Sequence, residues 1–495
     1  MNRNSLTTAV VAGIAGVVGI ANMANAVNLN PDGLGQVLLY PYYTVNNHQQ
    51  TLLSVVNTTS NGKAVKVRFL EGYNSREVLD FNLFLSPFDV WTASVFKLSD
   101  GSVAGDGAAI FTKDNSCTAP TFSSGPLANG AGYQAFLHYG YTGTASDGGP
   151  TGDDRTLEGH FEMISMADIT AGTLLTDITH VNGVPAKCSA AEGLLEAGGA
   201  TVIPPTGGLF GAASVVNVGQ GTYYTYNADA VDGFTSTTLV SPTGSLNPSL
   251  RDVNDVGGTT ATAFVFNNGA LVTAVYASSN AIDAVSALFD ASNVYNQYQH
   301  AADGSTGSDW VVTFPTKRFY VDTLYAGVAA PIIPFESRFS GTKTTQGLSC
   351  DVVGLSIFDR EERTTSTPTC GFSPCPPGQP PSSICHETNV ITFGGAGSSI
   401  LGSNLTSNVA SPYANGWLQV SFTDATHGGN AGTGHAHASR ADNNGTIFYG
   451  LPVSGFEAEN FVNGSVGGVL ANYSGVYRHR NSRCADTTQI AGACS

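Results

Sequence analysis

Residues 63–87, KAVKVRFLEGYNSREVLDFNLFLSP, decide the fold class of this chain. In the first half of the stretch, apolar residues alternate with Lys66 and Arg68, and in the second half they alternate with Asp80 and Asn82. Alternation with a period of two predicts two β-strands, each with one buried and one solvent-facing side. The glycine and the asparagine between the halves predict the turn of a hairpin.

Short strand-like segments continue along the chain and predict a mainly β protein. Closely spaced short strands favour antiparallel sandwiches. We therefore expect antiparallel β-sandwich modules, Ig-like or jelly-roll-like, with one or two short helices and disulfide-pinned loops. A capping-box pattern at residues 189–192 and a helical repeat of apolar residues from Asn280 mark the helices. Strands are expected at 36–45, 51–57, 65–69, 79–85, 90–96, 133–139, 157–165, 207–226, 261–276, 309–322, 390–393, 417–422 and 446–449.

Changes of composition divide the chain into three regions after an N-terminal leader. Residues 27–110 predict an N-terminal β-sandwich module. Residues 111–345 predict a β-rich central region with a short helix near 280–298. Residues 346–495 predict a C-terminal β-rich region that contains most of the cysteines.

The first 26 residues have the pattern of a secretory signal peptide. A basic start is followed by an uncharged stretch from Leu6 to Ile20 and by Ala24-Asn25-Ala26, the small residues that signal peptidase requires. The apolar run is shorter than the ~20 residues that span a bilayer. We expect cleavage after Ala26 and export to the cell surface or the extracellular space, with the periplasm as the alternative. No transmembrane span is expected in the mature chain.

The charge composition narrows the range of partners. Charged residues make up 12% of the chain, against about 25% in ordinary globular proteins. The net charge is nevertheless −17, from 37 acidic and 20 basic residues. Nucleic-acid binding depends on Lys and Arg neutralising phosphates, so this class of partner is excluded. Divalent cations and neutral partners suit such a surface.

An even number of cysteines in an exported chain predicts disulfides. We expect Cys117 to pair with Cys188 and Cys484 with Cys494, and the remaining four cysteines to form two bridges. The cysteine-rich stretch before His386 leaves zinc binding open, although an oxidising compartment favours disulfides. The eight residues are Cys117, Cys188, Cys350, Cys370, Cys375, Cys385, Cys484 and Cys494.

Four motifs resemble a family of largely uncharacterised exported proteobacterial cell-surface proteins. They are GHFEMISM at 159–166, TFPTKRFY at 313–320, DREE at 359–362 and GLPVSGF at 450–456. The resemblance extends over most of the chain after residue 26. It implies a cell-surface or surface-layer-like protein, and it brings no catalytic residues.

Three loops share the pattern Asp-Gly, four residues, Asp. Their glycines would let two carboxylates and nearby carbonyls converge, which is what calcium requires. The ligand spacing of an EF-hand is absent, and Asp-Gly is also a strong turn signal without any metal. Both interpretations stay open, and calcium is the cofactor that these loops would bind. The candidate residues are Asp100, Asp106, Asp147, Asp153, Asp303 and Asp309.

A histidine cluster at His427, His435 and His437 is the candidate transition-metal site. In an extended segment, His435 and His437 would point to one face. Together with Gly429 and Asp442, the cluster loosely resembles the first cupin motif, but no second cupin motif follows. The alternative is a glycine-rich surface loop with exposed imidazoles.

The sequence favours a protein without enzymatic activity. It contains no Gly-x-Ser-x-Gly, no His-Glu-x-x-His and no phosphate-binding Gly-Lys-Ser/Thr motif. We expect a noncatalytic structural or adhesive cell-surface protein that self-assembles with the help of divalent cations. The partners would be other copies, other surface components or glycans. The alternative is a secreted carbohydrate-binding protein or polysaccharide-acting hydrolase with Trp417 in a sugar platform, whereas Trp91 and Trp310 are expected in the core.

Overall fold

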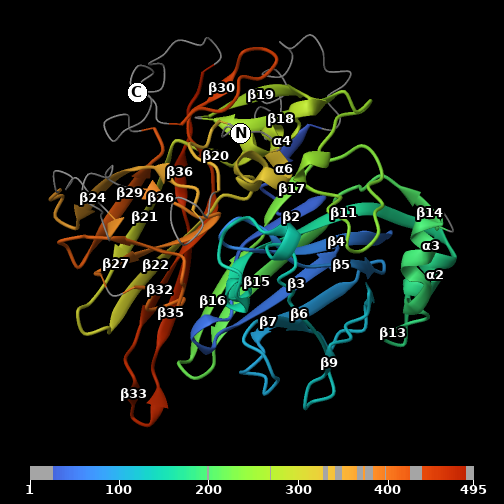
Figure 1. Cartoon of the computed structure of the whole chain (residues 1–495), viewed down its shortest axis with the longest axis horizontal. Coiled ribbons are helices and arrows are strands. Elements are labelled where there is room, and N and C mark those ends of the chain that lie inside the picture. Colours follow the sequence, from blue (N-terminus) through green and yellow to red (C-terminus); the bar gives the residue numbers. More distant parts are fainter. Residues whose placement is uncertain are drawn as a thin grey trace, which may run out of the picture.

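The computed structural model describes residues 26–197, 200–267, 269–326, 333–339, 348–364, 372–373, 383–395, 397–423 and 437–486. In this part of the chain the protein is mainly β, and the strand pairs are antiparallel apart from two. The predicted fold class is confirmed. Figure 1 shows the sheets of the N-terminal half beside those of the C-terminal half.

Two large sheets form the N-terminal half. Sheet A has the strand order β19-β18-β1-β17-β2-β11-β4-β5-β8, and β14 adds to β11. Sheet B has the order β16-β15-β3-β6-β7-β10-β9. The strands of sheet A are β1 (Val27–Leu29), β2 (Val37–Thr44), β4 (Gly62–Glu71), β5 (Glu77–Leu85), β8 (Cys117–Ala119), β11 (Glu158–Gly172), β14 (Ala200–Ile203), β17 (Asp229–Asp232), β18 (Thr260–Asn267) and β19 (Ala270–Ala277). Those of sheet B are β3 (Gln50–Asn57), β6 (Val90–Lys97), β7 (Ala108–Phe111), β9 (Gly125–Pro126), β10 (Gly132–Ala135), β15 (Leu209–Asn217) and β16 (Thr222–Asn227).

Sheets A and B share one apolar core. Strands β4 and β5 form the predicted hairpin, and Val67 pairs with Phe81 across it. Phe161 of β11 stacks on Tyr40 of β2 with 4.1 Å between ring centroids, and Trp91 of β6 packs against Phe81 from the other sheet at 5.7 Å. Alternating apolar residues therefore supply the face between the sheets, as the sequence predicts.

Two smaller sheets form the C-terminal half. One has the order β24-β29-β21-β36 and the other β25-β28-β27-β22-β32-β35. Trp310 is fully buried between them, 5.7 Å from the Phe393 ring, and its indole N–H donates to the Gln297 carbonyl at 2.9 Å. The strands are β21 (Asn293–Gln299), β22 (Thr306–Thr313), β24 (Gly354–Asp359), β25 (Phe372–Ser373), β27 (Thr388–Phe393), β28 (Thr406–Val409), β29 (Asn415–Ser421), β32 (Ser454–Phe461), β35 (Tyr473–Arg478) and β36 (Arg480–Ser482).

Five two-stranded pairs complete the described β-structure. They are β12 (His180–Val181) with β13 (Val184–Pro185), β20 (Asp290–Ala291) with β31 (Leu451–Pro452), β23 (Asp351–Val352) with β26 (Ser383–Ile384), β30 (Ile447–Phe448) with β37 (Ala485–Asp486), and β33 (Ser465–Val466) with β34 (Val469–Leu470).

The helices are short. The expected helix near 280–298 is α4, but it ends at Phe289 and the chain continues into strands. The expected strand 309–322 ends at Thr313, just before Pro315, which cannot donate to a sheet. No helix in the described residues is long and apolar enough to cross a membrane. The helices are α2 (Thr173–Ile178), α3 (Ala191–Glu196), α4 (Ile282–Phe289), α5 (Arg318–Val321) and α6 (Thr323–Ala326).

Strand pairing crosses both of the region boundaries drawn from the sequence, because β21 and β22 before residue 345 pair with β29, β27 and β32 after it. Sheet A joins strands from residues 27–110 with strands from residues 158–277, so these two segments fold together. The boundaries themselves remain predictions.

Two disulfides pin loops onto the sheets. Cys117 pairs with Cys188, as predicted, and Cys350 pairs with Cys385. Cys484 is also disulfide-bonded, but its predicted partner Cys494 lies outside the described residues, as do Cys370 and Cys375.

Gly159 allows β11 to lie close against β4. A Cβ atom at this position would lie 2.0 Å from the Leu70 carbonyl oxygen and 2.9 Å from the Glu71 Cα atom. We expect Gly159→Ala to lower the free energy of unfolding by about 1–3 kcal/mol, because the backbone must shift. Gly193→Ala in α3 is the control, since nothing lies within 4 Å of its Cβ position. Equal urea-unfolding midpoints for the two variants would contradict the prediction.

Candidate functional site

The alternation from Lys63 to Leu85 predicts a solvent-facing side for the hairpin β4–β5, and this prediction is wrong. Lys66 and Arg68 are fully buried. The Lys66 ammonium donates to Asp80 at 2.8 Å and to the Pro242 carbonyl at 3.0 Å. Arg68 donates to Glu77 at 2.6 Å. Carbonyl groups of the segment 242–248 thus cover a face of sheet A that carries charges.

Glu162 binds both Arg68 and Arg318, and so connects two of the four motifs described in the sequence. Glu162 lies in the 159–166 motif, and Arg318 lies in the 313–320 motif. The Glu162 Oε1 atom accepts from Arg68 at 2.9 Å and from Arg318 at 2.9 Å. Burial raises the pKa of Glu162, but the two guanidinium groups outweigh it and hold the pKa below its ordinary value. Glu162 is therefore a buried anion between two cations.

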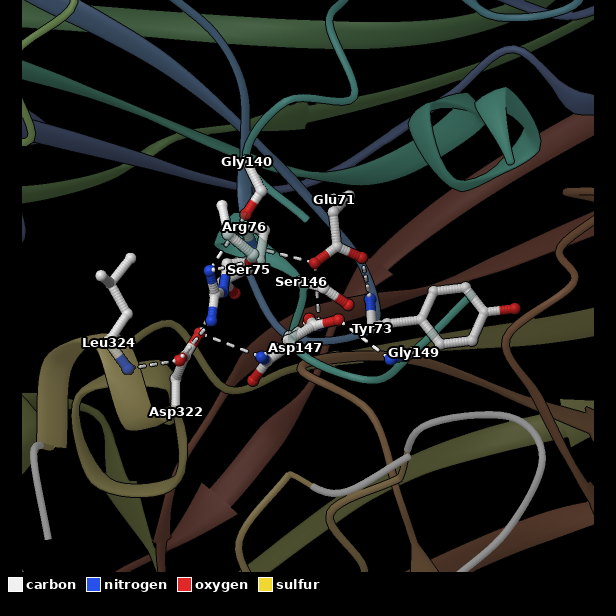
Figure 2. A network of polar contacts seen from close by, with 12 residues as sticks. Glu71, Tyr73, Ser75, Arg76, Gly140, Ser146, Asp147, Gly149, Asp322 and Leu324 are labelled. Carbon is white, nitrogen blue, oxygen red and sulfur yellow. Dashed lines mark hydrogen bonds and ion pairs between the residues drawn. The ribbon is translucent and has the colours of Figure 1, made fainter. Parts of the chain in front are cut away.

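The turn after β4 holds a second group of buried charges, drawn in Figure 2. The Glu71 carboxylate accepts the backbone N–H groups of Tyr73, Asn74 and Arg76 at 2.8, 3.0 and 2.8 Å and so fixes the turn. Arg155 donates to both Glu71 oxygens at 2.7 and 2.9 Å. Because its guanidinium also stacks 4.4 Å above the Tyr141 ring, Arg155 is held on two sides.

Arg155 also binds the predicted calcium residue Asp147. Its guanidinium donates to the two Asp147 oxygens at 2.5 and 3.0 Å. Burial raises the pKa of Asp147, but Arg155 and then Asn74 outweigh it and lower the pKa below its ordinary value. Asp147 is thus an internal counterion in this structure.

Asp322, between α5 and α6, is the third carboxylate of this group and binds Arg76. Arg76 donates to both Asp322 oxygens at 2.5 and 2.8 Å. The Asn74 amide donates to Asp322 at 2.9 Å and to Asp147 at 3.0 Å, so one side chain bridges two carboxylates. The two carboxylates are labelled in Figure 2. We call Glu71, Asn74, Arg76, Asp147, Arg155 and Asp322 the junction network. It ties the β4–β5 turn to the segment before β11 and to the residue between α5 and α6.

Two further buried groups lie beside this region. The Lys317 ammonium donates to Asp351 at 2.6 Å and to the Ser349 carbonyl at 2.6 Å, next to the Cys350–Cys385 disulfide. Glu387 accepts from the Ser75 hydroxyl at 2.7 Å, and its other oxygen finds no hydrogen-bond partner among the described residues. Burial raises the pKa of Glu387 to about 8.

The junction network holds each of its carboxylates in several hydrogen bonds. Each of its carboxylates is bound by a guanidinium and by further N–H donors, and cavities described elsewhere are lined by other residues. The arrangement can orient strands and neutralise buried charge.

The remaining candidate calcium residues of the Asp-Gly loops do not converge on a metal site in the described part of the chain. Asp100 and Asp153 accept from His48 and His138 at the surface, and Asp106 and Asp303 are exposed. Asp309 is buried and accepts from Ser398 and from two backbone N–H groups. Within the described ranges, no three His, Cys, Asp or Glu side chains are grouped to hold a metal ion.

His437 is the part of the histidine cluster that can be placed, since His427 and His435 lie outside the described residues. It is buried, with Nδ1 2.9 Å from the Pro334 carbonyl and Nε2 2.8 Å from the Val352 carbonyl. Asp442 accepts the N–H groups of Asn444 and Thr446. The two residues of the cupin-like pattern that the structure describes, His437 and Asp442, are thus hydrogen-bonded to backbone groups.

Sequence reasoning missed the junction network. The sequence predicts a turn between the two strands, at residues 71–76, but no pattern in it links that turn to Arg155 or Asp322. The small number of Lys and Arg residues is a signal that could have revealed the network. When cations are few, those within or next to strongly apolar strands are candidates for burial. Comparisons with protein families, curated proteins and solved structures found no match for this chain.

Removing the Arg155 guanidinium should strand two buried carboxylates. We expect Arg155→Gln to cost about 3–5 kcal/mol of the free energy of unfolding, because a buried ion pair is broken on one side. Arg360→Gln is the control: Arg360 is exposed, and surface charges contribute about 0–1 kcal/mol. Guanidinium-chloride unfolding of both variants checks this, and similar losses would contradict it.

Glu387 should make stability depend on pH. Its folded-state pKa of about 8 exceeds the ordinary value of about 4.3. Between these values the folded chain keeps a proton that the unfolded chain has released, so stability falls as pH rises. Urea unfolding at pH 5 and pH 8 should show a smaller loss for Glu387→Gln than for the unsubstituted chain. The exposed Glu361→Gln is the control, and a pH slope unchanged by Glu387→Gln would refute the assignment.

Proposed function

We propose that this chain is a noncatalytic structural or adhesive protein of the cell surface, which associates with further copies of itself. The observation that carries the proposal is the hairpin β33–β34, which projects from the body of the protein (Figure 1). Val466 and Val469 face each other across it and are 62% and 68% exposed. Apolar side chains presented in this way are typical of interaction surfaces.

The apolar surface continues from the hairpin to the edge of sheet B. Leu470 in β34 and Tyr473 at the start of β35 are also exposed. The Ser474 hydroxyl donates to the Tyr223 carbonyl at 2.9 Å and accepts the Tyr223 N–H at 3.0 Å, which joins β35 to the edge strand β16. The strand β35, which follows the hairpin, is thus hydrogen-bonded to β16. This contact fixes the position of the hairpin, so a partner would bind a rigid surface.

The interior of the protein suits a scaffold. Buried ion pairs join segments far apart in sequence, and disulfides pin loops at Cys117–Cys188 and Cys350–Cys385. A rigid body transmits mechanical load without needing a moving site. The resemblance to exported surface proteins agrees with this role, and cleavage after Ala26 would leave strand β1 intact.

Calcium would act between copies rather than inside one copy. Asp147 and Asp309 are engaged by internal donors. Asp106, Asp153 and Asp303 are at the surface, where a divalent cation could bridge two acidic faces. In this proposal calcium strengthens an association that the apolar hairpin begins.

The hairpin should govern self-association. We expect the full chain to form concentration-dependent oligomers in analytical ultracentrifugation, and the double variant Val466→Asp/Val469→Asp to weaken them at least tenfold, because charges must be desolvated at the contact. Val256→Asp, at an equally exposed valine away from the hairpin, is the control.

Calcium should tighten the oligomers further, and EDTA should reverse that effect. A chain that stays monomeric at high concentration, with and without calcium, would overturn the self-assembly proposal.

A further inference from the structure

A groove crosses the outer face of sheet B. It has a volume of about 480 Å³ and passes over β16, β15, β3, β6 and β7, which lie side by side in the lower centre of Figure 1. Neighbouring strands are about 4.8 Å apart, so five strands make the groove about 19 Å long. This length suits an extended chain molecule better than a compact ligand.

The strand register places one row of side chains along the groove. Leu52 lies opposite Ser214 on one side and Ser94 on the other. Ser214 in turn faces Thr225, and Ser94 faces Phe111. From β16 to β7 the row therefore contains three hydroxyl-bearing and two apolar side chains: Thr225, Ser214, Leu52, Ser94 and Phe111.

The floor of the groove is low because its residues are small. Ser54 pairs with Ala212 and with Thr92 in the neighbouring row, and all three line the cavity. Small side chains between larger ones leave a trough across the strands. The trough is a consequence of residue size in a regular sheet and needs no bulge or loop.

Hydroxyl groups gather at one end of the groove. The Ser214 hydroxyl donates to the Tyr223 oxygen at 2.9 Å and lies 2.9 Å from the Thr225 hydroxyl. The Tyr223 ring is 55% exposed. An aromatic ring with a polar tip offers a flat apolar surface and hydrogen bonding in one place.

The chemistry of this lining matches a neutral carbohydrate. Sugars combine hydroxyl groups with apolar C–H faces, and the groove offers hydroxyls together with Leu52, Phe111 and Tyr223. Lys113 is the one charged residue that lines it, and a single ammonium can donate to sugar oxygens. We propose that this groove binds a neutral oligosaccharide, extended across the strands, with Tyr223 as its stacking platform.

A peptide added as an extra strand fits this face poorly. Such binding uses unpaired backbone groups of an edge strand. Strands β15, β3, β6 and β7 each pair with neighbours on both sides, so their backbone groups face along the sheet and not into the groove. The ligand must be recognised by side chains.

Oligosaccharide binding goes beyond the structural role proposed above and does not depend on it. The groove lies over β16, β15, β3, β6 and β7, whereas self-association is assigned to Val466 and Val469. The protein could bind sugar without self-associating, or self-associate without binding sugar. Variants of Tyr223 test sugar binding, and variants of Val466 and Val469 test self-association.

Isothermal titration calorimetry on the full chain with cellohexaose, maltohexaose, chitohexaose and xylohexaose tests the groove, and polygalacturonate serves as the acidic probe. We expect at least one neutral hexasaccharide to bind, and Tyr223→Ala to weaken it at least tenfold. Tyr139→Ala, at an exposed tyrosine outside the groove, should leave binding unchanged, as should Trp417→Ala on the other half of the protein.

Four results would overturn the proposal. They are no binding of any neutral probe, binding insensitive to Tyr223→Ala, binding lost in Trp417→Ala instead, and binding of polygalacturonate alone that Lys113→Gln abolishes. A dimer that Tyr223→Ala disrupts, without sugar binding, would assign the groove to a second copy. Circular dichroism and unfolding midpoints equal to those of the unsubstituted chain verify that each variant is folded.

Discussion

Burial of Arg68 is the constraint on which much of this architecture depends. A guanidinium inside a protein costs several kcal/mol unless anions and carbonyl groups surround it. Arg68 meets that requirement with Glu77 on the next strand, with Glu162 on β11 and with the Pro248 carbonyl. The chain must therefore bring residues 94 and 180 positions away onto one face of sheet A. Glu162 then also binds Arg318, so the same requirement reaches the segment that follows β22.

The junction network extends this logic to the end of the hairpin. Glu71 fixes the turn by accepting three backbone N–H groups, but it is tolerable inside the protein because Arg155 neutralises it. Arg155 needs a second anion, and the Asp147 side chain supplies it. Each charge is thus satisfied only when a segment from elsewhere in the chain is in place. Apolar contacts tolerate small displacements, whereas these bidentate pairs specify one arrangement.

The sequence predicts what is local and misses what is distant. Alternation from Lys63 to Leu85 predicts both strands because side-chain period follows from strand geometry. It does not reveal that Lys66 is covered, because its cover, the Pro242 carbonyl, lies 176 residues away. Asp147 and Asp309 follow a pattern shared by turns and calcium loops, and internal donors engage both. The end of β22 before Pro315 was readable in advance from proline's missing N–H.

Burying charged side chains also changes what the surface can recognise. More acids than bases are buried in the described residues, so the exterior is less acidic than a net charge of −17 suggests. The cations that remain outside are few, and side chains such as Leu52, Val466 and Tyr223 are exposed instead. Recognition by this surface would rest on apolar contacts and on hydroxyl and amide hydrogen bonds, which salt screens little. The exposed apolar and hydroxyl-bearing side chains therefore suit the neutral partners proposed above, a second copy or a sugar chain, in surroundings of changing ionic strength.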